Sequence, residues 1–256
     1  MWTNRLCTGM FFAVSSIVSS SASKLNKKFS TIVNHAFVKP ISSSQQQYHA
    51  ALLDDSVPMV VAYGPAGCGK TLLACDAFVR MYQQGKYSRM ILTRPSVPVE
   101  GENLGFLPGN VQTKMAPWTQ PVFDLLANYY SSSEIHSMIQ KQIIDVIPLA
   151  FMRGRSFHKA FIIGDEMQNS GVSQWKTLIS RCGLDSKMVL TGDLAQSDLS
   201  GLNGLDDFLF KHQSRPFSSC QVVELKNDSI CRSPLVRDYL DWMGGGNPGF
   251  PQGPHP

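Results

Sequence analysis

Short apolar runs of five to seven residues alternate along this chain with longer stretches that have the spacing of amphipathic helices. The expected strands are Met59–Tyr63, Arg89–Thr93, Ile143–Leu149, Ala160–Gly164, Lys187–Thr191 and Cys220–Leu225. The expected helices are Thr71–Gln84, Val111–Tyr130, Ser133–Gln140, Gly171–Arg181, Leu202–Gln213 and Ser233–Met243. Mostly apolar strands are covered on both faces, so the alternation predicts an α/β fold with a mostly parallel sheet and helices on both faces. Ligands of such sheets bind at the carboxyl ends of the strands.

The composition is that of one globular domain: of 256 residues, 43% are hydrophobic and 16% are charged. The formal net charge of +4 is concentrated near the N-terminus, where five of the 23 Lys and Arg residues precede Asp54, the first acidic residue. The 18 basic residues that follow are balanced by 19 acidic ones, which weakens any inference of nucleic-acid binding from charge. The six cysteines contain no C-x-x-C pair, so neither a zinc site nor a disulfide framework is indicated.

The two ends of the chain differ in composition from its centre. Residues 1–40 are rich in Ser and contain no acid, which is typical of a transit peptide for a mitochondrion or plastid. A secretory signal, or an untargeted tail on a cytoplasmic protein, remains an alternative. The apolar run Met10–Val18 is shorter than the roughly 20 residues that span a bilayer, so no transmembrane span is expected. Residues 41–243 are expected to form the domain, and the Gly- and Pro-rich residues 244–256 are expected to be a disordered tail.

The segment GPAGCGKT follows the first expected strand and opens a helix. It matches the phosphate-binding pattern G-x-x-x-x-G-K-[ST] in the structural context that this pattern requires. Its residues are Gly64, Pro65, Ala66, Gly67, Cys68, Gly69, Lys70 and Thr71. Glycines let backbone N–H groups surround phosphates, and the helix N-terminus adds partial positive charge. We expect Lys70 to reach the β- and γ-phosphates and the Thr71 hydroxyl to hold Mg²⁺.

Two adjacent acids, Asp165 and Glu166, follow the strand Ala160–Gly164. Mg²⁺ prefers oxygen ligands, so we expect Asp165 to hold the metal together with Thr71. A carboxylate one residue later can orient the water that attacks the γ-phosphate and accept its proton, which is the role expected of Glu166. The alternative is that Glu166 is a solvated acid at the start of the next helix.

Two glutamines lie near the same strand ends. Gln168 follows the acids, and Gln196 follows the next strand in the segment LTGDLAQSDL. A glutamine that contacts the γ-phosphate or the attacking water would report the state of the nucleotide to its own loop. The alternative for Gln196 is a solvated loop amide.

Five ordered segments, GPAGCGKT, TRPSVPVEGENLGFLPG, PLAFMRGRSF, FIIGDEMQNS and VLTGDLAQSDL, together resemble the PhoH-like (phosphate-starvation-inducible) ATPase family. The resemblance covers Ser42 to Met243. It implies a RecA-like P-loop ATPase core that is related to the motor domains of superfamily 1 helicases. It also implies ATP and Mg²⁺ as ligands, a homo-oligomeric ring that could be a hexamer, and a link to RNA.

The resemblance also assigns roles to individual residues. Gly64–Thr71 corresponds to the Walker A loop, Asp165 and Glu166 to Walker B, and Gln168 to its extension, with Gln196 as the sensor. The segment SQQQYH matches a Q-x-x-Y pattern, which implies that Gln45 reads the edge of the adenine while the ring of Tyr48 packs against it.

Arg232, in CRSPLVRDYL, is the candidate arginine finger supplied by a neighbouring subunit, and Arg94, Arg153 and Arg155 are its competitors. Two positions depart from the family pattern. Met167 stands where Ala is more frequent, and Gly164 stands where Leu is common, which is expected to loosen the end of the strand.

Three functions are compatible with these features. Adjacent acids favour hydrolysis of ATP, with Glu166, Lys70, Gln196 and Arg232 as catalytic residues. A P-loop kinase is the second reading, but it has no need of the water-activating acid. The third is a nucleotide-dependent module that binds RNA or single-stranded DNA. For that module Phe106 and Trp118 are the candidates for base stacking, although core packing is their more ordinary role.

Overall fold

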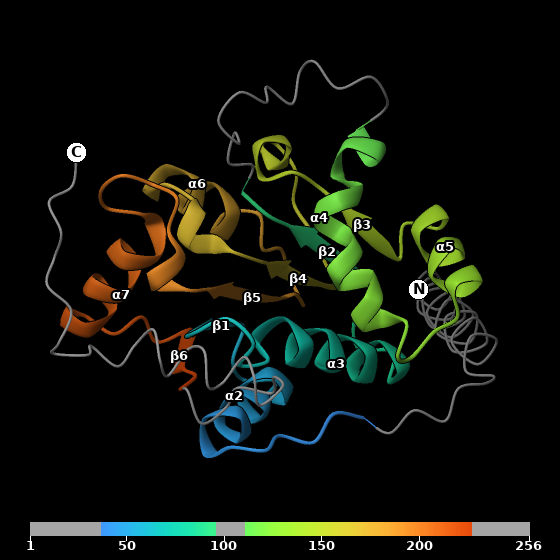
Figure 1. Ribbon diagram of the computed structural model, residues 1–256, viewed down its shortest axis with the longest axis horizontal. Coiled ribbons are helices and arrows are strands. Elements are labelled where there is room, and N and C mark those ends of the chain that lie inside the picture. The colour runs from blue at the N-terminus through green and yellow to red at the C-terminus, as the bar shows by residue number, and fades with distance from the viewer. Residues whose placement is uncertain (1–36, 96–110, 227–256) are drawn as a thin grey trace, which may run out of the picture.

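The computed structural model describes residues 37–95 and 111–226, with side chains from Thr119 onward in the second range (Figure 1). Six parallel strands form one sheet in the order β3-β2-β4-β5-β1-β6. The strands are β1 (Met59–Tyr63), β2 (Arg89–Thr93), β3 (Ile144–Val146), β4 (Ala160–Gly164), β5 (Lys187–Gly192) and β6 (Cys220–Glu224). The helices are α2 (Ser43–Leu53), α3 (Lys70–Gln83), α4 (Val111–Leu126), α5 (Ser132–Gln140), α6 (Val172–Ile179) and α7 (Gly204–Ser214).

The strands carry apolar side chains on both faces because both faces are covered. In β1, Val60 and Ala62 belong to one core cluster with α2, α3, α4 and α5, whereas Met59 and Val61 belong to a second cluster with α6 and α7. Figure 1 shows the two helical layers on opposite sides of the sheet. The α/β fold predicted from the sequence, a RecA-like P-loop fold with a parallel sheet between helices, is confirmed.

Two predicted boundaries differ from the structure. The strand expected over Ile143–Leu149 narrows to three residues, because Pro148 ends the extended segment and Leu149–Met152 form a short 3-10 helix, η1. Helix α2 was not predicted, because its sequence SSQQQYHAALL lacks a regular apolar repeat. The hydroxyl of Ser42 accepts the N–H of Gln45 and caps this helix.

The folded part of the chain begins earlier than the predicted boundary at residue 40. The guanidinium of Arg80 lies 4.1 Å from the centre of the Phe37 ring. The N–H of Val38 donates to Asp76 Oδ1 at 2.9 Å. Phe37 and Val38 therefore pack on α3. The rest of the predicted leader, the predicted helix Ser233–Met243 and the predicted tail lie outside the described residues. Within the described ranges, no helix is long and apolar enough to cross a membrane.

The strand order brings distant residues to one edge of the sheet. Strand β5 lies between β1, which precedes the glycine-rich loop, and β4, which precedes Asp165. Because all strands are parallel, the residues after β1, β5, β4 and β2 meet at the same edge. The loop after β5, which forms the 3-10 helix η3 (Leu194–Gln196), therefore lies between the glycine-rich loop and the two acids.

Candidate nucleotide-binding site

The glycine-rich loop Gly64–Thr71 connects β1 to α3 and requires glycine at two positions. Gly64 has a φ of 149°, and a Cβ there would collide with the carbonyl oxygen of Leu225, the residue after β6. Gly69 is the N-cap of α3 in the left-handed conformation, with a φ of 89°. The loop is partly exposed and leads directly into the first turn of α3, where unpaired N–H groups and partial positive charge favour an anion.

Lys70 extends its ammonium group back over this loop. Its Nζ donates to the carbonyl oxygens of Gly64 at 2.6 Å and Pro65 at 2.9 Å, and it lies 3.7 Å from Cys68 Sγ. The loop's own carbonyls thus hold the cation where the loop curls. This is the placement that a phosphate-binding lysine needs.

Thr71 and Asp165 are in contact at the carboxyl edge of the sheet, as we expected from the sequence. The Thr71 hydroxyl donates to Asp165 Oδ1 at 2.8 Å. Thr191, at the end of β5, donates to the same oxygen at 2.5 Å. Thr191 was not singled out from the sequence, because its position between the two motifs depends on the strand order.

The donor set at this point suits a hard cation. A hydroxyl and a carboxylate oxygen face each other, and oxygen ligands are those that Mg²⁺ prefers. In the part of the chain that the structure describes, no group of three or more His, Cys, Asp or Glu residues could form a metal cage. Mg²⁺ held by Thr71 and Asp165 would therefore take most of its ligands from phosphates and water, which is its usual mode of binding.

Glu166 adopts an unusual backbone conformation beside this oxygen pair. Its φ of 53° and ψ of 42° lie in the left-handed region, which costs roughly 1–2 kcal/mol for a residue other than glycine. It precedes the 3-10 helix η2 (Met167–Asn169), yet its side chain makes no capping hydrogen bond. Its carboxylate is one third exposed, with Oε1 at 4.0 Å from an Arg94 nitrogen and Oε2 accepting a hydrogen bond from Gln168 at 2.7 Å.

The two glutamines have different environments. Gln168 is buried, with 1% of its surface exposed, behind Glu166. The prediction that Gln168 contacts the nucleotide does not fit this position, because a buried amide presents no surface to a ligand. The side chain of Gln196 is exposed, and its backbone oxygen accepts a hydrogen bond from Gln168 at 3.2 Å.

Gln45 and Tyr48 lie beneath the glycine-rich loop. Gln45 Nε2 donates to the Cys68 carbonyl at 3.0 Å, and the Tyr48 hydroxyl donates to the Lys70 carbonyl at 3.1 Å. Tyr48 has no exposed surface, and this burial raises the pKa of its phenol well above the ordinary value. The expected packing of this ring against adenine does not fit the geometry, because a fully buried ring offers no face to a base. Both residues of α2 instead support the loop from below.

The two departures from the family pattern, Gly164 and Met167, are in contact. A Cβ on Gly164 would lie 3.1 Å from the sulfur of Met167 and 2.7 Å from a methyl group of Leu190. Met167 is fully buried and occupies the space over the glycine. The expected loosening of the strand end is wrong: β4 is buried and paired through Gly164. The small and the large residue compensate for each other.

The candidate arginines differ in their partners and in their exposure. Arg94 faces Glu166, whereas Arg155 pairs with Asp145 at 3.2 Å and lies over the Phe157 ring. Arg153 is exposed. Arg232, Phe106 and the side chain of Trp118 lie outside the described residues.

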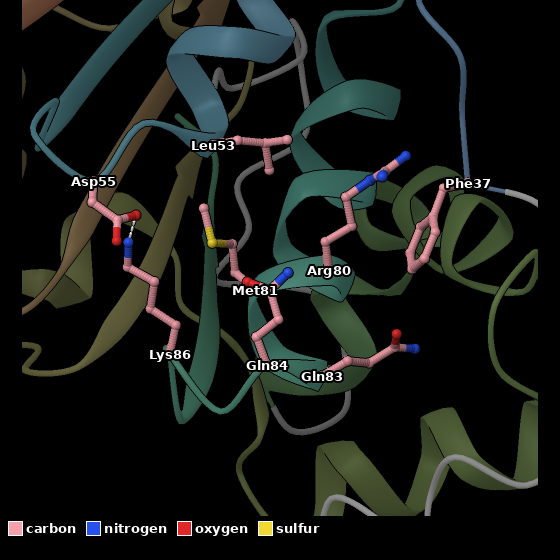
Figure 2. Close-up of a pocket in the computed structure, with 8 residues that line it drawn as sticks. All are labelled: Phe37, Leu53, Asp55, Arg80, Met81, Gln83, Gln84 and Lys86. Carbon is pink, nitrogen blue, oxygen red and sulfur yellow. Dashed lines mark ion pairs between the residues drawn. The ribbon is translucent and has the colours of Figure 1, made fainter.

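A cavity of about 480 Å³ lies at the far end of α3, one helix length from the glycine-rich loop. Figure 2 shows its lining, with the Asp55–Lys86 ion pair on one side and Arg80 and Phe37 on the other. Arg80 is also paired, because its Nε donates to Asp76 at 2.6 Å. Arg80 also donates to the carbonyl oxygen of Val38 at 3.2 Å. Both cations of the lining are thus paired with acids, Arg80 with Asp76 and Lys86 with Asp55.

Comparisons with known proteins find relatives over most of the chain. A family model described as "PhoH-like protein" matches residues 37–243. The "PhoH-like protein" of Bacillus subtilis is 36% identical over 202 residues, which cover 77% of this chain and 61% of that protein. That of Synechocystis is 37% identical over 202 residues, covering 77% of this chain and 59% of the relative.

"Protein PhoH2" of Bacillus subtilis is 37% identical over 212 residues, covering 79% of this chain and 48% of the relative. Among solved structures, the large terminase of a thermophilic bacteriophage is 13% identical with a TM-score of 0.48, covering 80% of this chain and 50% of its own. The chain spans about half to three fifths of the length of these curated relatives. On the family match and these identities, the chain belongs to the PhoH-like protein family.

Proposed function

We propose that this protein is an ATPase that hydrolyses ATP in a Mg²⁺-dependent reaction at the edge formed by β1, β5 and β4. The observation that carries the proposal is the contact of Thr71 with Asp165, directly followed in sequence by the partly exposed carboxylate of Glu166. A phosphate loop, a metal-binding oxygen pair and a second acid are the parts that hydrolysis of a γ-phosphate requires.

Each residue has a distinct task in the proposed reaction. The N–H groups of Gly64–Thr71 bind the phosphates, and Lys70 exchanges the carbonyls of Gly64 and Pro65 for phosphate oxygens. Thr71 and Asp165 hold Mg²⁺, which when bound neutralises charge on the phosphates. Glu166 orients the attacking water and accepts its proton. Gln196, exposed on the loop after β5, contacts the nucleotide end of the site and reports hydrolysis to that loop.

The proposal extends to assembly. A single sheet edge covers only one side of a bound nucleotide, so a neighbouring subunit in a homo-oligomeric ring would supply the other side, with Arg232 as the finger. Hydrolysis would then drive a conformational change at the subunit interface. A link of this change to RNA is part of the proposal and is supported by the family resemblance, and single-stranded DNA is the alternative partner.

The direct test of the metal site is phosphate release over a series of Mg²⁺ concentrations. We expect release by the wild type to require Mg²⁺ and Asp165→Asn to lower it by about 100-fold or more. Asp145→Asn is the matched control, because Asp145 is a carboxylate that pairs with Arg155 and not with Thr71. Release that is unchanged in Asp165→Asn, or unchanged in EDTA, would overturn the assignment.

A further inference from the structure

The amide of Gln168 uses all its N–H donors inside the protein. Its Nε2 donates to Glu166 Oε2 at 2.7 Å and to the backbone oxygen of Gln196 at 3.2 Å. Its Oε1 accepts the backbone N–H of Asp193 at 3.0 Å. A side-chain amide has two N–H donors and one oxygen, and these three partners fix which end is which. Gln168 is therefore locked in one orientation and has no donor left for a ligand.

The carboxylate of Glu166 has a short contact with this amide. Its left-handed backbone turns the carboxylate away from the line of β4, and its side chain makes no cap bond to η2. The contact of Arg94 with Oε1 is long, at 4.0 Å, so the 2.7 Å bond from Gln168 is the shorter of these two contacts to the carboxylate. A charge-assisted bond of that length holds an acceptor more firmly than a distant ion pair at a partly exposed site.

The same amide ties Glu166 to the loop after β5. Gln168 bonds both Asp193 and Gln196, the residues at the start and end of the η3 turn. The Ser197 hydroxyl donates to the Gln168 backbone oxygen at 3.1 Å, and the Asp198 N–H donates to Asn169 Oδ1 at 2.8 Å. Four hydrogen bonds thus join η2 to residues 193–198, and a shift of that loop must move the Gln168 amide.

We propose that Gln168 is a positioning residue, which orients the Glu166 carboxylate for the attacking water and makes that orientation depend on the loop 193–198. The inference rests on the proposed function, because it assigns Glu166 to the water. It replaces the role that the sequence suggested for Gln168, a direct contact with the nucleotide. The rate of hydrolysis would then depend on the position of the loop 193–198, through the buried Gln168 amide, as well as on the bound phosphate.

The test compares phosphate release and ATP binding in wild type and Gln168→Met, which keeps the volume of the side chain but removes its hydrogen bonds. We expect kcat to fall about 10- to 100-fold, a part of the 10²–10⁴-fold contribution of a general base, with the Kd for ATP changed by less than about threefold. In the Glu166→Gln background, Gln168→Met should cost nothing further, because residues that act as a unit are not additive.

Gln174→Ala is the matched control. Gln174 Oε1 accepts the N–H of Gly171 at the start of α6, so it is a capping glutamine on the next helix and not a partner of Glu166. We expect its kcat to stay within about twofold of wild type. Gln168→Glu is the second variant, in case Gln168→Met does not fold. It keeps an acceptor for Asp193 but places a carboxylate against Glu166, and it should lower kcat at least as much.

The outcomes separate the inference from the proposed function. If the wild type is active and a folded Gln168 variant has the same kcat, the inference is overturned but the proposed function is not. Loss of ATP affinity by the same factor as kcat also overturns it, because that result assigns Gln168 to binding. A wild type that binds ATP and releases no phosphate overturns the proposed function and the inference with it.

Discussion

Asp165 and Glu166 are neighbours in sequence but have different partners in the structure. Asp165 continues the direction of β4 and receives two hydroxyl groups, from Thr71 and Thr191. Glu166 leaves that direction through a left-handed backbone and is bonded by Gln168. The residue types at this site were predictable from the sequence because the motifs name them. The partner Thr191 was not, because it depends on β5 lying between β1 and β4. Gln168 was named from the sequence as a contact of the nucleotide, whereas in the structure it bonds Glu166.

Tyr48→Phe tests the support of the glycine-rich loop by α2. The variant loses only the hydrogen bond to the Lys70 carbonyl, so we expect the free energy of unfolding to fall by about 1 kcal/mol. Affinity for ATP and for GTP should fall by the same factor, because the loop binds phosphates and not the base. Urea denaturation and nucleotide titration measure the two effects. If the affinity for ATP and the affinity for GTP changed by different factors, Tyr48 would be in contact with the base after all.

Gly164→Ala and Met167→Ala test the compensating pair beneath the acids. The first variant pushes a methyl group against Leu190 and Met167, and we expect a loss of about 1–3 kcal/mol in the free energy of unfolding. The second removes a buried side chain and should cost about 2–5 kcal/mol. In the double variant the methyl group gains room, so the loss should be smaller than the sum by at least about 0.5 kcal/mol. Additive losses in urea denaturation would show that the two residues do not share the space.

At the scale of elements, the strands other than β3 were predicted closely because each is an apolar run between polar segments. β1, β2 and β4 have the predicted bounds, while β5 is longer and β6 shorter by one residue. Helix α2 was not predicted because its buried residues are few and partly polar, including Ser44 and Gln45. Its stability comes from tertiary contacts: Gln45 and Tyr48 bond the glycine-rich loop near one end, and Lys187 bonds the other.

Lys187 gives α2 a pH-dependent anchor. Its Nζ donates to the carbonyls of Ala51 at 2.8 Å and Asp54 at 2.7 Å, and burial lowers its pKa to about 8. Between about pH 8 and 10.5 the unfolded chain binds more protons at this residue than the folded protein does, so its contribution to stability rises with pH.

The matched variant Lys187→Met isolates this contribution. Between pH 7 and pH 9.5, we expect the free energy of unfolding of the wild type to rise relative to the variant by on the order of 2 kcal/mol. Guanidinium denaturation of both proteins at the two pH values measures the difference between their free energies of unfolding. Because both proteins contain the same tyrosines and cysteines, the titration of those residues cancels in this difference. An equal pH dependence of the two proteins would contradict the assignment.

At the scale of the whole molecule, the proposed ring makes each site depend on two subunits. Lys70→Ala disables the glycine-rich loop and Arg232→Ala the proposed finger, so each variant alone should be inactive. Mixed in equal amounts, they should recover about a quarter of wild-type phosphate release, since half of the loops are intact and half of those face an intact finger. A mixture of Lys70→Ala with Glu166→Gln is the control.

The control mixture pairs two residues of the same subunit's site. In a ring where Lys70 and Glu166 act within one chain, no mixed site contains both, so this mixture should stay inactive. Recovery in both mixtures, or in neither, would contradict the placement of Arg232 in a neighbouring subunit.

The central claim, hydrolysis of ATP by Glu166 beside a metal held at Asp165, is tested most directly by a single-turnover measurement. Labelled ATP is bound to wild type and to Glu166→Gln, and bound ATP and free phosphate are followed in time. We predict that both proteins bind ATP and that Glu166→Gln cleaves it about 10²–10⁴-fold more slowly. Equal cleavage by the two proteins would contradict the claim, as would transfer of the labelled phosphate to an added acceptor instead of to water.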